Sequence, residues 1–130
     1  MFIKEVNKYS EIIDKKCLKK IVDVKTIIPY EEFIQKLEES DLLILFGNSS
    51  KLQVPGKVYD YLGSLTKILL INNTQDYIFD PTFNLITNYG NNYYCNNIEI
   101  DIRDTLISIY ELWMQDELGK NEYDEVQKFT

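Results

Sequence analysis

Blocks of apolar and polar residues alternate along the chain and predict strands and helices in turn. Short, continuous apolar runs at residues 42–46 (LLILF) and 67–71 (KILLI) predict strands that are buried on both faces. The β-branched stretch 21–28 (IVDVKTII) predicts another strand, and residues 93–95 predict a fourth, shorter one. Each strand is followed by a segment that has a helical pattern or a turn.

Helices are predicted wherever apolar residues recur at intervals of three and four. This spacing predicts an amphipathic helix over residues 2–20 and a short helix that follows Pro29 and ends near residue 40. Pro55 opens the next predicted helix, and a further short helix is expected near residues 81–87. The last helix runs from residue 98 to about 115. Its apolar face consists of Ile98, Ile102, Leu106, Ile109 and Trp113.

This order of elements defines a fold class. Apolar strands that alternate with helices are typical of a parallel sheet covered by helices on both faces. Right-handed crossovers then give a Rossmann-like three-layer sandwich with a mostly parallel sheet. The length of 130 residues suits one compact domain, and no linker or internal repeat divides it. We therefore predict a single α/β domain over residues 1–130.

Composition removes several classes of function. There are 14 Lys and Arg residues against 21 Asp and Glu, a formal net charge of -7, which disfavours nucleic-acid binding because that needs clustered cations. Histidine is absent, which removes the commonest general base, the Ser–His and Cys–His nucleophile pairs and most zinc sites. No apolar run approaches the ~20 residues that span a bilayer. Two cysteines, Cys17 and Cys95, make no disulfide framework and favour a reducing, cytoplasmic compartment.

Ligands of open parallel sheets bind at the carboxyl ends of the strands. In this sequence, candidate ligand-binding groups are densest in the segment that follows the apolar run at residues 42–46. The hydroxyls of Ser49 and Ser50, the backbone N–H groups of Gly56 and Lys57, and the Lys57 ammonium suit a phosphate. Asp60 lies one turn further on, where a carboxylate can accept hydrogen bonds from a ribose diol. An ordinary helix start with a surface ion pair would look the same, and spacing alone favours that second interpretation.

A longer sequence pattern favours the ligand-binding interpretation over the ordinary helix start. The stretch SDLLILFGNSSKLQVPGKVYDYLGSLTKILLI, residues 40–71, resembles the C-terminal domain of GT-B glycosyltransferases, particularly the bacterial group that builds surface polysaccharides. Its pattern is a strand, a polar loop, the motif P-x-K-x-[FY]-[ED]-Y-L at residues 55–62, and a second strand. Weaker matches at residues 27–41 and 96–113 extend the resemblance to roughly residues 20–115.

The resemblance implies half of a GT-B fold that binds a nucleotide sugar as its donor substrate, with no metal or other cofactor. It implies that Asp60 contacts the ribose, that Lys57 lies near the donor phosphates, and that Asn48, Ser49 and Ser50 border the sugar or diphosphate. It assigns no catalytic residue here, since the family's base usually belongs to an N-terminal acceptor domain that this sequence does not match. We therefore expect a fragment or natural half of an enzyme that transfers a sugar to an acceptor hydroxyl, with little or no activity alone.

This sequence also departs from the family pattern. Asp60 is one methylene shorter than the usual glutamate, and the Gly-x-Pro before the next strand is replaced by residues 65–67 (LTK). The only arginine, Arg103, falls in the last predicted helix, so the basic pair that grips the diphosphate has no counterpart. The alternative is a non-catalytic, Rossmann-like interaction or regulatory domain. As to location, the resemblance leaves open the cytoplasm or a peripheral position at the inner face of the cell membrane.

Overall fold

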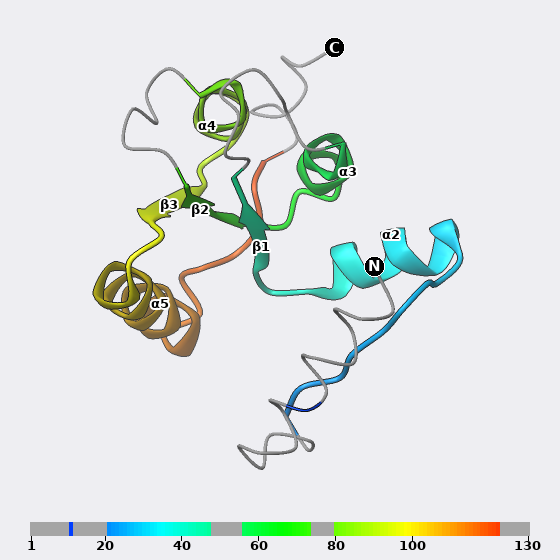
Figure 1. The fold of residues 1–130 in the computed structure, drawn as a ribbon, viewed down its shortest axis with the longest axis horizontal. Coiled ribbons are helices and arrows are strands. Elements are labelled where there is room, and N and C mark those ends of the chain that lie inside the picture. Colours follow the sequence, from blue (N-terminus) through cyan, green and yellow to red (C-terminus); the bar gives the residue numbers. More distant parts are fainter. Residues whose placement is uncertain (1–10, 12–20, 48–55, 74–79, 123–130) are drawn as a thin grey trace. The chain divides into compact units, whose positions relative to one another are not determined.

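The computed structural model describes residue 11 and residues 21–47, 56–73 and 80–122 of the chain (Figure 1). Contacts divide the chain into two compact units, Met1–Phe33 and Ile34–Thr130, and each is described by itself. The predicted helix over residues 2–20 lies outside the described residues except for residue 11. The elements are α2 (Tyr30–Glu39), β1 (Leu43–Phe46), α3 (Lys57–Gly63), β2 (Ile68–Asn72), α4 (Pro81–Asn88), β3 (Tyr93–Asn96) and α5 (Glu99–Met114).

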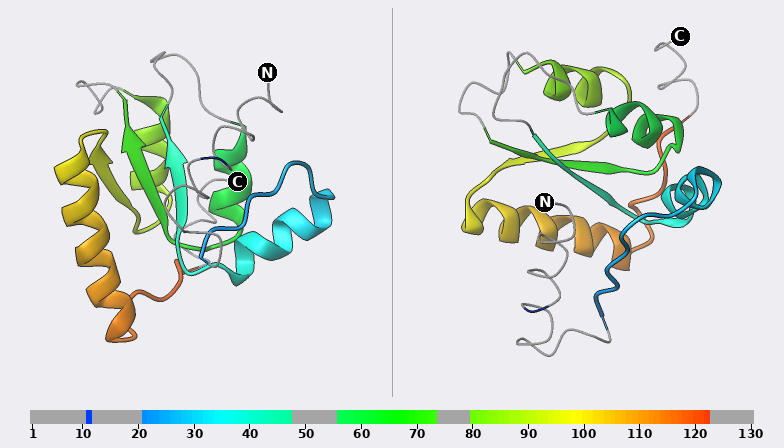
Figure 2. Two further views of the ribbon diagram at one scale, coloured as in Figure 1. Left: turned by 60° about the horizontal axis from the view of Figure 1, so that its bottom comes forward. Right: turned by 45° about the vertical axis from the view of Figure 1, so that its right-hand side comes forward.

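The three strands form one parallel sheet in the order β1-β2-β3. Leu43 of β1 pairs with Ile68 of β2, and Leu69 of β2 pairs with Tyr93 of β3. α3 connects β1 to β2, and α4 connects β2 to β3, so the two crossovers run in the same direction across the sheet. Because such crossovers are right-handed, both helices lie on the same face of the sheet, while α5 lies on the other face (Figure 2). The predicted Rossmann-like α/β sandwich is confirmed in these layers.

Two layers of apolar side chains hold the sheet between its helices. On the face covered by α5, the core consists of Leu69, Ile71, Cys95, Ile109 and Leu118. Ile68 and Leu70 point to the opposite face, since side chains alternate along a strand, and both are fully buried. Val58 and Leu62 of α3 are likewise buried. The prediction that the 67–71 strand is buried on both faces is therefore confirmed.

The prediction that the 42–46 strand is also buried on both faces is wrong. β1 alternates between buried and exposed positions, with Leu43 and Leu45 buried and Ile44 and Phe46 exposed by 43% and 60%. The physical reason is position: within the described residues β1 is an edge strand, and α5 packs over β2 and β3. A run of apolar residues alone does not distinguish a central strand from an edge strand whose outer face is uncovered.

The predicted strand over residues 21–28 is also wrong. These residues form no strand, and Ile21 and Ile27 are exposed by 81% and 86%. β-branched residues fit a pleated surface, but a strand is stable only when a neighbouring strand takes its backbone hydrogen bonds. None of the three described strands pairs with this stretch.

The segment after α5 closes the amino edge of the sheet. Lys120 forms an antiparallel bridge with Thr66, and its Nζ donates to the carbonyl oxygens of Glu38 and Ser40 at 2.8 and 2.7 Å. Thr66 Oγ1 in turn donates to the carbonyl oxygen of Leu37 at 2.6 Å. The C-terminal half of α2, the start of β2 and the end of the described chain are therefore joined by polar contacts at this edge.

Candidate functional site

At the carboxyl edge of the sheet, where the strands lead toward the helices, asparagine side chains form hydrogen bonds between the ends of neighbouring strands. Asn73 Nδ2 donates to the carbonyl oxygen of Gly47, and Asn97 Nδ2 donates to Asn73 Oδ1 at 2.7 Å. The backbone N–H of Asn97 donates to the carbonyl oxygen of Asn72 at 2.9 Å. These bonds link the ends of β1, β2 and β3, so the three loops start from fixed positions.

Buried polar groups lie directly at this edge. Asn72 ends β2 and is buried; its Nδ2 donates to the carbonyl oxygen of Cys95 at 3.1 Å, while its Oδ1 has no hydrogen-bond partner among the described residues. Asp80 is buried at the start of α4, where it accepts from the backbone N–H of Thr82 at 2.9 Å. The hydroxyl of Thr82 is buried and has no hydrogen-bond partner in the part of the chain that the structure describes. Unsatisfied buried groups cost free energy, and they are uncommon in folded proteins.

Lys57 and Asp60 both lie on α3, the helix that follows β1 in the order of elements along the chain. Lys57 is the first residue of α3 and is exposed, whereas Asp60 is half-buried. Val58 and Leu62 form the buried face of this helix, so the helical period places Lys57 and Asp60 on the side turned away from that face. The predicted helix is therefore confirmed from Lys57 onward, while Pro55, its predicted first residue, lies outside the described residues and the role of the charged pair in binding stays a prediction.

The three helices that follow the described strands differ in the charge at their first turns. The start of α4 is capped by the Asp80 carboxylate, and α5 has Glu99 and Asp101 in its first turn. α3 begins at Lys57 after Gly56, which makes no side-chain cap, and its first turn carries both Lys57 and Asp60. Of these three helix starts, only that of α3 carries a cation, and this cation lies one turn from the Asp60 carboxylate.

The other predicted site residues cannot all be located. Asn48, Ser49 and Ser50 lie outside the described residues. Gly56 is described, is exposed, and precedes Lys57 at the helix start, as predicted. The described part of the predicted site is thus Gly56, Lys57 and Asp60 on one short segment.

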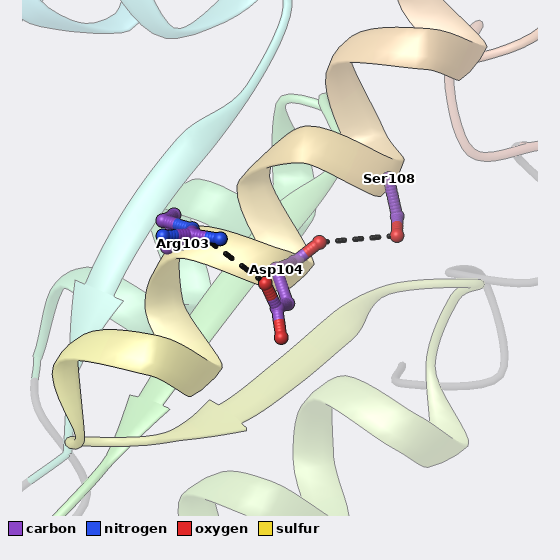
Figure 3. Close-up of polar contacts among 3 residues, drawn as sticks. All are labelled: Arg103, Asp104 and Ser108. Carbon is purple, nitrogen blue, oxygen red and sulfur yellow. Dashed lines mark hydrogen bonds and ion pairs between the residues drawn. The ribbon is translucent and has the colours of Figure 1, made fainter.

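Arg103 is not among the described residues that gather at the carboxyl edge. It lies on α5, where its Nε is 3.8 Å from Asp104 Oδ1, and both side chains are largely exposed (Figure 3). The backbone carbonyl oxygen of Asp104 accepts a hydrogen bond from Ser108 Oγ at 3.1 Å, one turn further along. The guanidinium therefore belongs to a solvent-facing ion pair, which contributes little to stability.

A small hollow of about 210 Å³ lies at the junction of β3 and α5, lined by Tyr94, Cys95, Asn96, Asp101 and Thr105. Burial raises the pKa of the Cys95 thiol, the negative charge of Asp101 raises it further, and a hydrogen bond with Thr105 opposes them. Within the ranges that the structure describes, no three acidic, cysteine or histidine side chains are grouped to hold a metal ion, and no helix is long and apolar enough to cross a membrane.

We expect Cys95 to react slowly with alkylating reagents in the folded protein. The thiolate is the nucleophile, and a raised pKa keeps the thiol protonated at pH values where an ordinary cysteine begins to ionise. Peptide mapping after timed iodoacetamide treatment at pH 8 should show Cys95 modified at least about tenfold more slowly than in urea-unfolded protein. Equal rates in the two states would contradict its protection.

Sequence reasoning missed the asparagines at the carboxyl edge. The same Asn-Asn pair lies at the end of β2 (Asn72 and Asn73) and at the end of β3 (Asn96 and Asn97). This repetition at two strand ends was the available signal. Asp80 could also have been identified, since an aspartate before a proline is typical of a capped helix start.

In comparisons with known proteins, no family model, curated protein or solved structure matches the chain.

Proposed function

We propose that this chain is the donor-binding domain of a glycosyltransferase, which holds a nucleotide sugar for transfer to an acceptor hydroxyl in surface polysaccharide synthesis. The observation that carries the proposal is the position of α3. It follows an apolar parallel strand in the chain, begins with Lys57, and carries Asp60 one turn later. Open parallel sheets bind nucleotides at the carboxyl edge.

In this proposal each charged residue has a distinct task. The Lys57 ammonium neutralises the donor diphosphate and stabilises the negative charge that develops when the sugar departs. The Asp60 carboxylate accepts hydrogen bonds from the two ribose hydroxyls. The acid–base group and the acceptor site come from a partner domain, so we expect the chain alone to transfer little or no sugar.

Nucleotide titrations test these tasks separately. We expect UDP, GDP or ADP to bind at up to millimolar concentration, and Asp60→Ala to weaken both the nucleotide and its nucleoside by about tenfold or more, because a hydrogen bond to a charged group is lost. Lys57→Ala should weaken the nucleotide and leave the nucleoside unchanged, since only the nucleotide carries phosphates. Chemical-shift changes in NMR titrations measure all of these affinities.

Two further variants sharpen the result. Asp60→Glu restores the side-chain length usual in the resembling family and should bind at least as tightly as the unmodified chain. Asp104→Ala removes an exposed carboxylate on α5 and should leave binding unchanged. If no nucleotide binds at millimolar concentration, or if Asp60→Ala binds normally, the donor-binding proposal is wrong and the alternative of a non-catalytic domain is favoured.

A further inference from the structure

The face of the sheet that α5 covers carries an apolar groove beside that helix. Its volume is about 380 Å³, and we call it the α5 groove. It is lined by Asp41, Leu42, Leu106, Ile109, Tyr110, Trp113 and Leu118. Ile109 and Leu118 are buried and form its floor, while Tyr110 and Trp113 are exposed and form one wall. The two aromatic rings pack together, with centroids 5.8 Å apart.

The apolar surface continues from the groove along β1. Leu42 lines the groove, and side-chain alternation places Ile44 and Phe46 on the same face of the strand. Both are exposed, because α5 packs over β2 and β3 and no other described helix covers this part of the sheet. In layered α/β structures, helices that cover one face of a sheet pack side by side at about 8–10 Å between their axes.

The rim of the groove is acidic at the end near Trp113. A smaller hollow of about 160 Å³ shares Asp41, Trp113 and Leu118 with the groove and adds Asp116, Gly119 and Lys120. Asp41 and Asp116 are exposed carboxylates. The Lys120 ammonium is held by the carbonyl oxygens of Glu38 and Ser40 and by Thr66 Oγ1, so it is directed into the protein. The chain as a whole carries a net charge of -7.

We propose that the α5 groove binds an amphipathic helix of a partner polypeptide whose apolar stripe is flanked by Lys or Arg. The apolar side chains of that helix cover Leu42, Ile44 and Tyr110, and its cations meet Asp41 and Asp116. A cation beside the exposed face of Trp113 gains further stabilisation from the ring. This is the helix-in-groove mode of recognition, with opposite charges that select the partner. It does not depend on the proposed donor-binding role.

Trp113 is the only tryptophan of the chain and reports directly on this groove. The test titrates the full chain with a synthetic leucine–lysine peptide of about five helical turns, patterned as an amphipathic helix. The expected result is a saturable blue shift of the Trp113 emission, with a Kd of about 1–100 µM. A peptide with the same leucines and glutamate in place of lysine should bind at least about tenfold more weakly.

Variants then locate the binding. Ile44→Ser and Tyr110→Ser change exposed residues and should each weaken binding of the lysine peptide several-fold. Ile100→Ser changes another exposed isoleucine, on the outer side of α5, and should leave binding unchanged. The double change Asp41→Asn and Asp116→Asn should remove the preference for the lysine peptide. Circular dichroism confirms that each variant is folded before it is titrated.

Three results would overturn the proposal. The first is no saturable shift with the lysine peptide, and the second is equal affinity for the two peptides. The third is a dimer of the chain, seen by sedimentation, that Ile44→Ser dissociates, since the occupant would then be a second copy. None of these outcomes bears on Asp60 or on nucleotide binding, so the two proposals fail separately.

Discussion

Gly90→Ala is expected to destabilise the folded protein by about 2–4 kcal/mol. Gly90 has φ 136°, a conformation that residues with a side chain rarely adopt. A Cβ at this position would lie 2.8 Å from Asn92 Nδ2 and 2.9 Å from Asn121 Nδ2, inside normal contact distance. Backbone strain and steric overlap therefore act together at this turn.

The overlap is costly because the two amides are already fixed by other bonds. Asn92 Nδ2 donates to the carbonyl oxygen of Ile86 at 2.8 Å, and Asn121 Nδ2 donates to Asn92 Oδ1 at 3.0 Å. Neither side chain can move away without losing a hydrogen bond. Urea denaturation followed by circular dichroism measures the change in the free energy of unfolding.

Gly63→Ala is the matched control for this change. Gly63 ends α3, and a Cβ there would meet nothing within 4 Å. Since glycine is disfavoured in helices by up to ~1 kcal/mol relative to alanine, this substitution should be neutral or slightly stabilising. Similar stabilities for the two variants would show that the turn at Gly90 tolerates a side chain.

Asn121→Ala is expected to cost about 2–4 kcal/mol, because it removes the centre of a buried network at the amino edge of the sheet. Asn121 Oδ1 accepts from Lys67 Nζ and from the backbone N–H of Asn91, both at 2.9 Å. Lys67 Nζ also donates to the carbonyl oxygen of Asn91 at 2.8 Å, and Lys67 and Asn121 are both buried. The alanine variant leaves a buried ammonium with one acceptor fewer.

A double-variant experiment separates the loss of packing from the loss of the charge partner. Adding Lys67→Met to Asn121→Ala removes the poorly solvated ammonium, so the double variant should lose less stability than the sum of the two single variants. Asn84→Ala, an exposed asparagine of α4, is the control and should change the free energy of unfolding by no more than ~0.5 kcal/mol. Strict additivity would contradict a direct coupling between Lys67 and Asn121.

Prediction from the sequence succeeded where a local pattern is sufficient. The apolar run of β2 and the three-and-four spacing in α5 identify these elements with bounds correct to within about two residues. The short helix near residues 81–87 is α4, which begins at Pro81 behind the Asp80 cap. Such patterns predict the folded structure correctly because they depend only on residues that are close together in the sequence.

Prediction failed where an element depends on its neighbours in space. Residues 21–28 have the composition of a strand but form none in the structure, and β1 has the composition of a central strand but lies at an edge. For the candidate site, the sequence placed Gly56, Lys57 and Asp60 at a helix start. It did not indicate the asparagine bonds between strand ends, which join Gly47, Asn73 and Asn97 across the sheet.

The sequence by itself determined the alternation of strands and helices, the parallel α/β class, and a lysine and an aspartate one turn apart after the first strand. Periodicity and helix-start chemistry act over a few residues, so a linear sequence displays them directly. Only the tertiary structure decided which apolar residues stay uncovered beside α5 and which polar side chains meet at the two edges of the sheet. Those outcomes depend on contacts between residues far apart in the chain, such as Lys67 with Asn121, and no local pattern records which distant residue will be the partner.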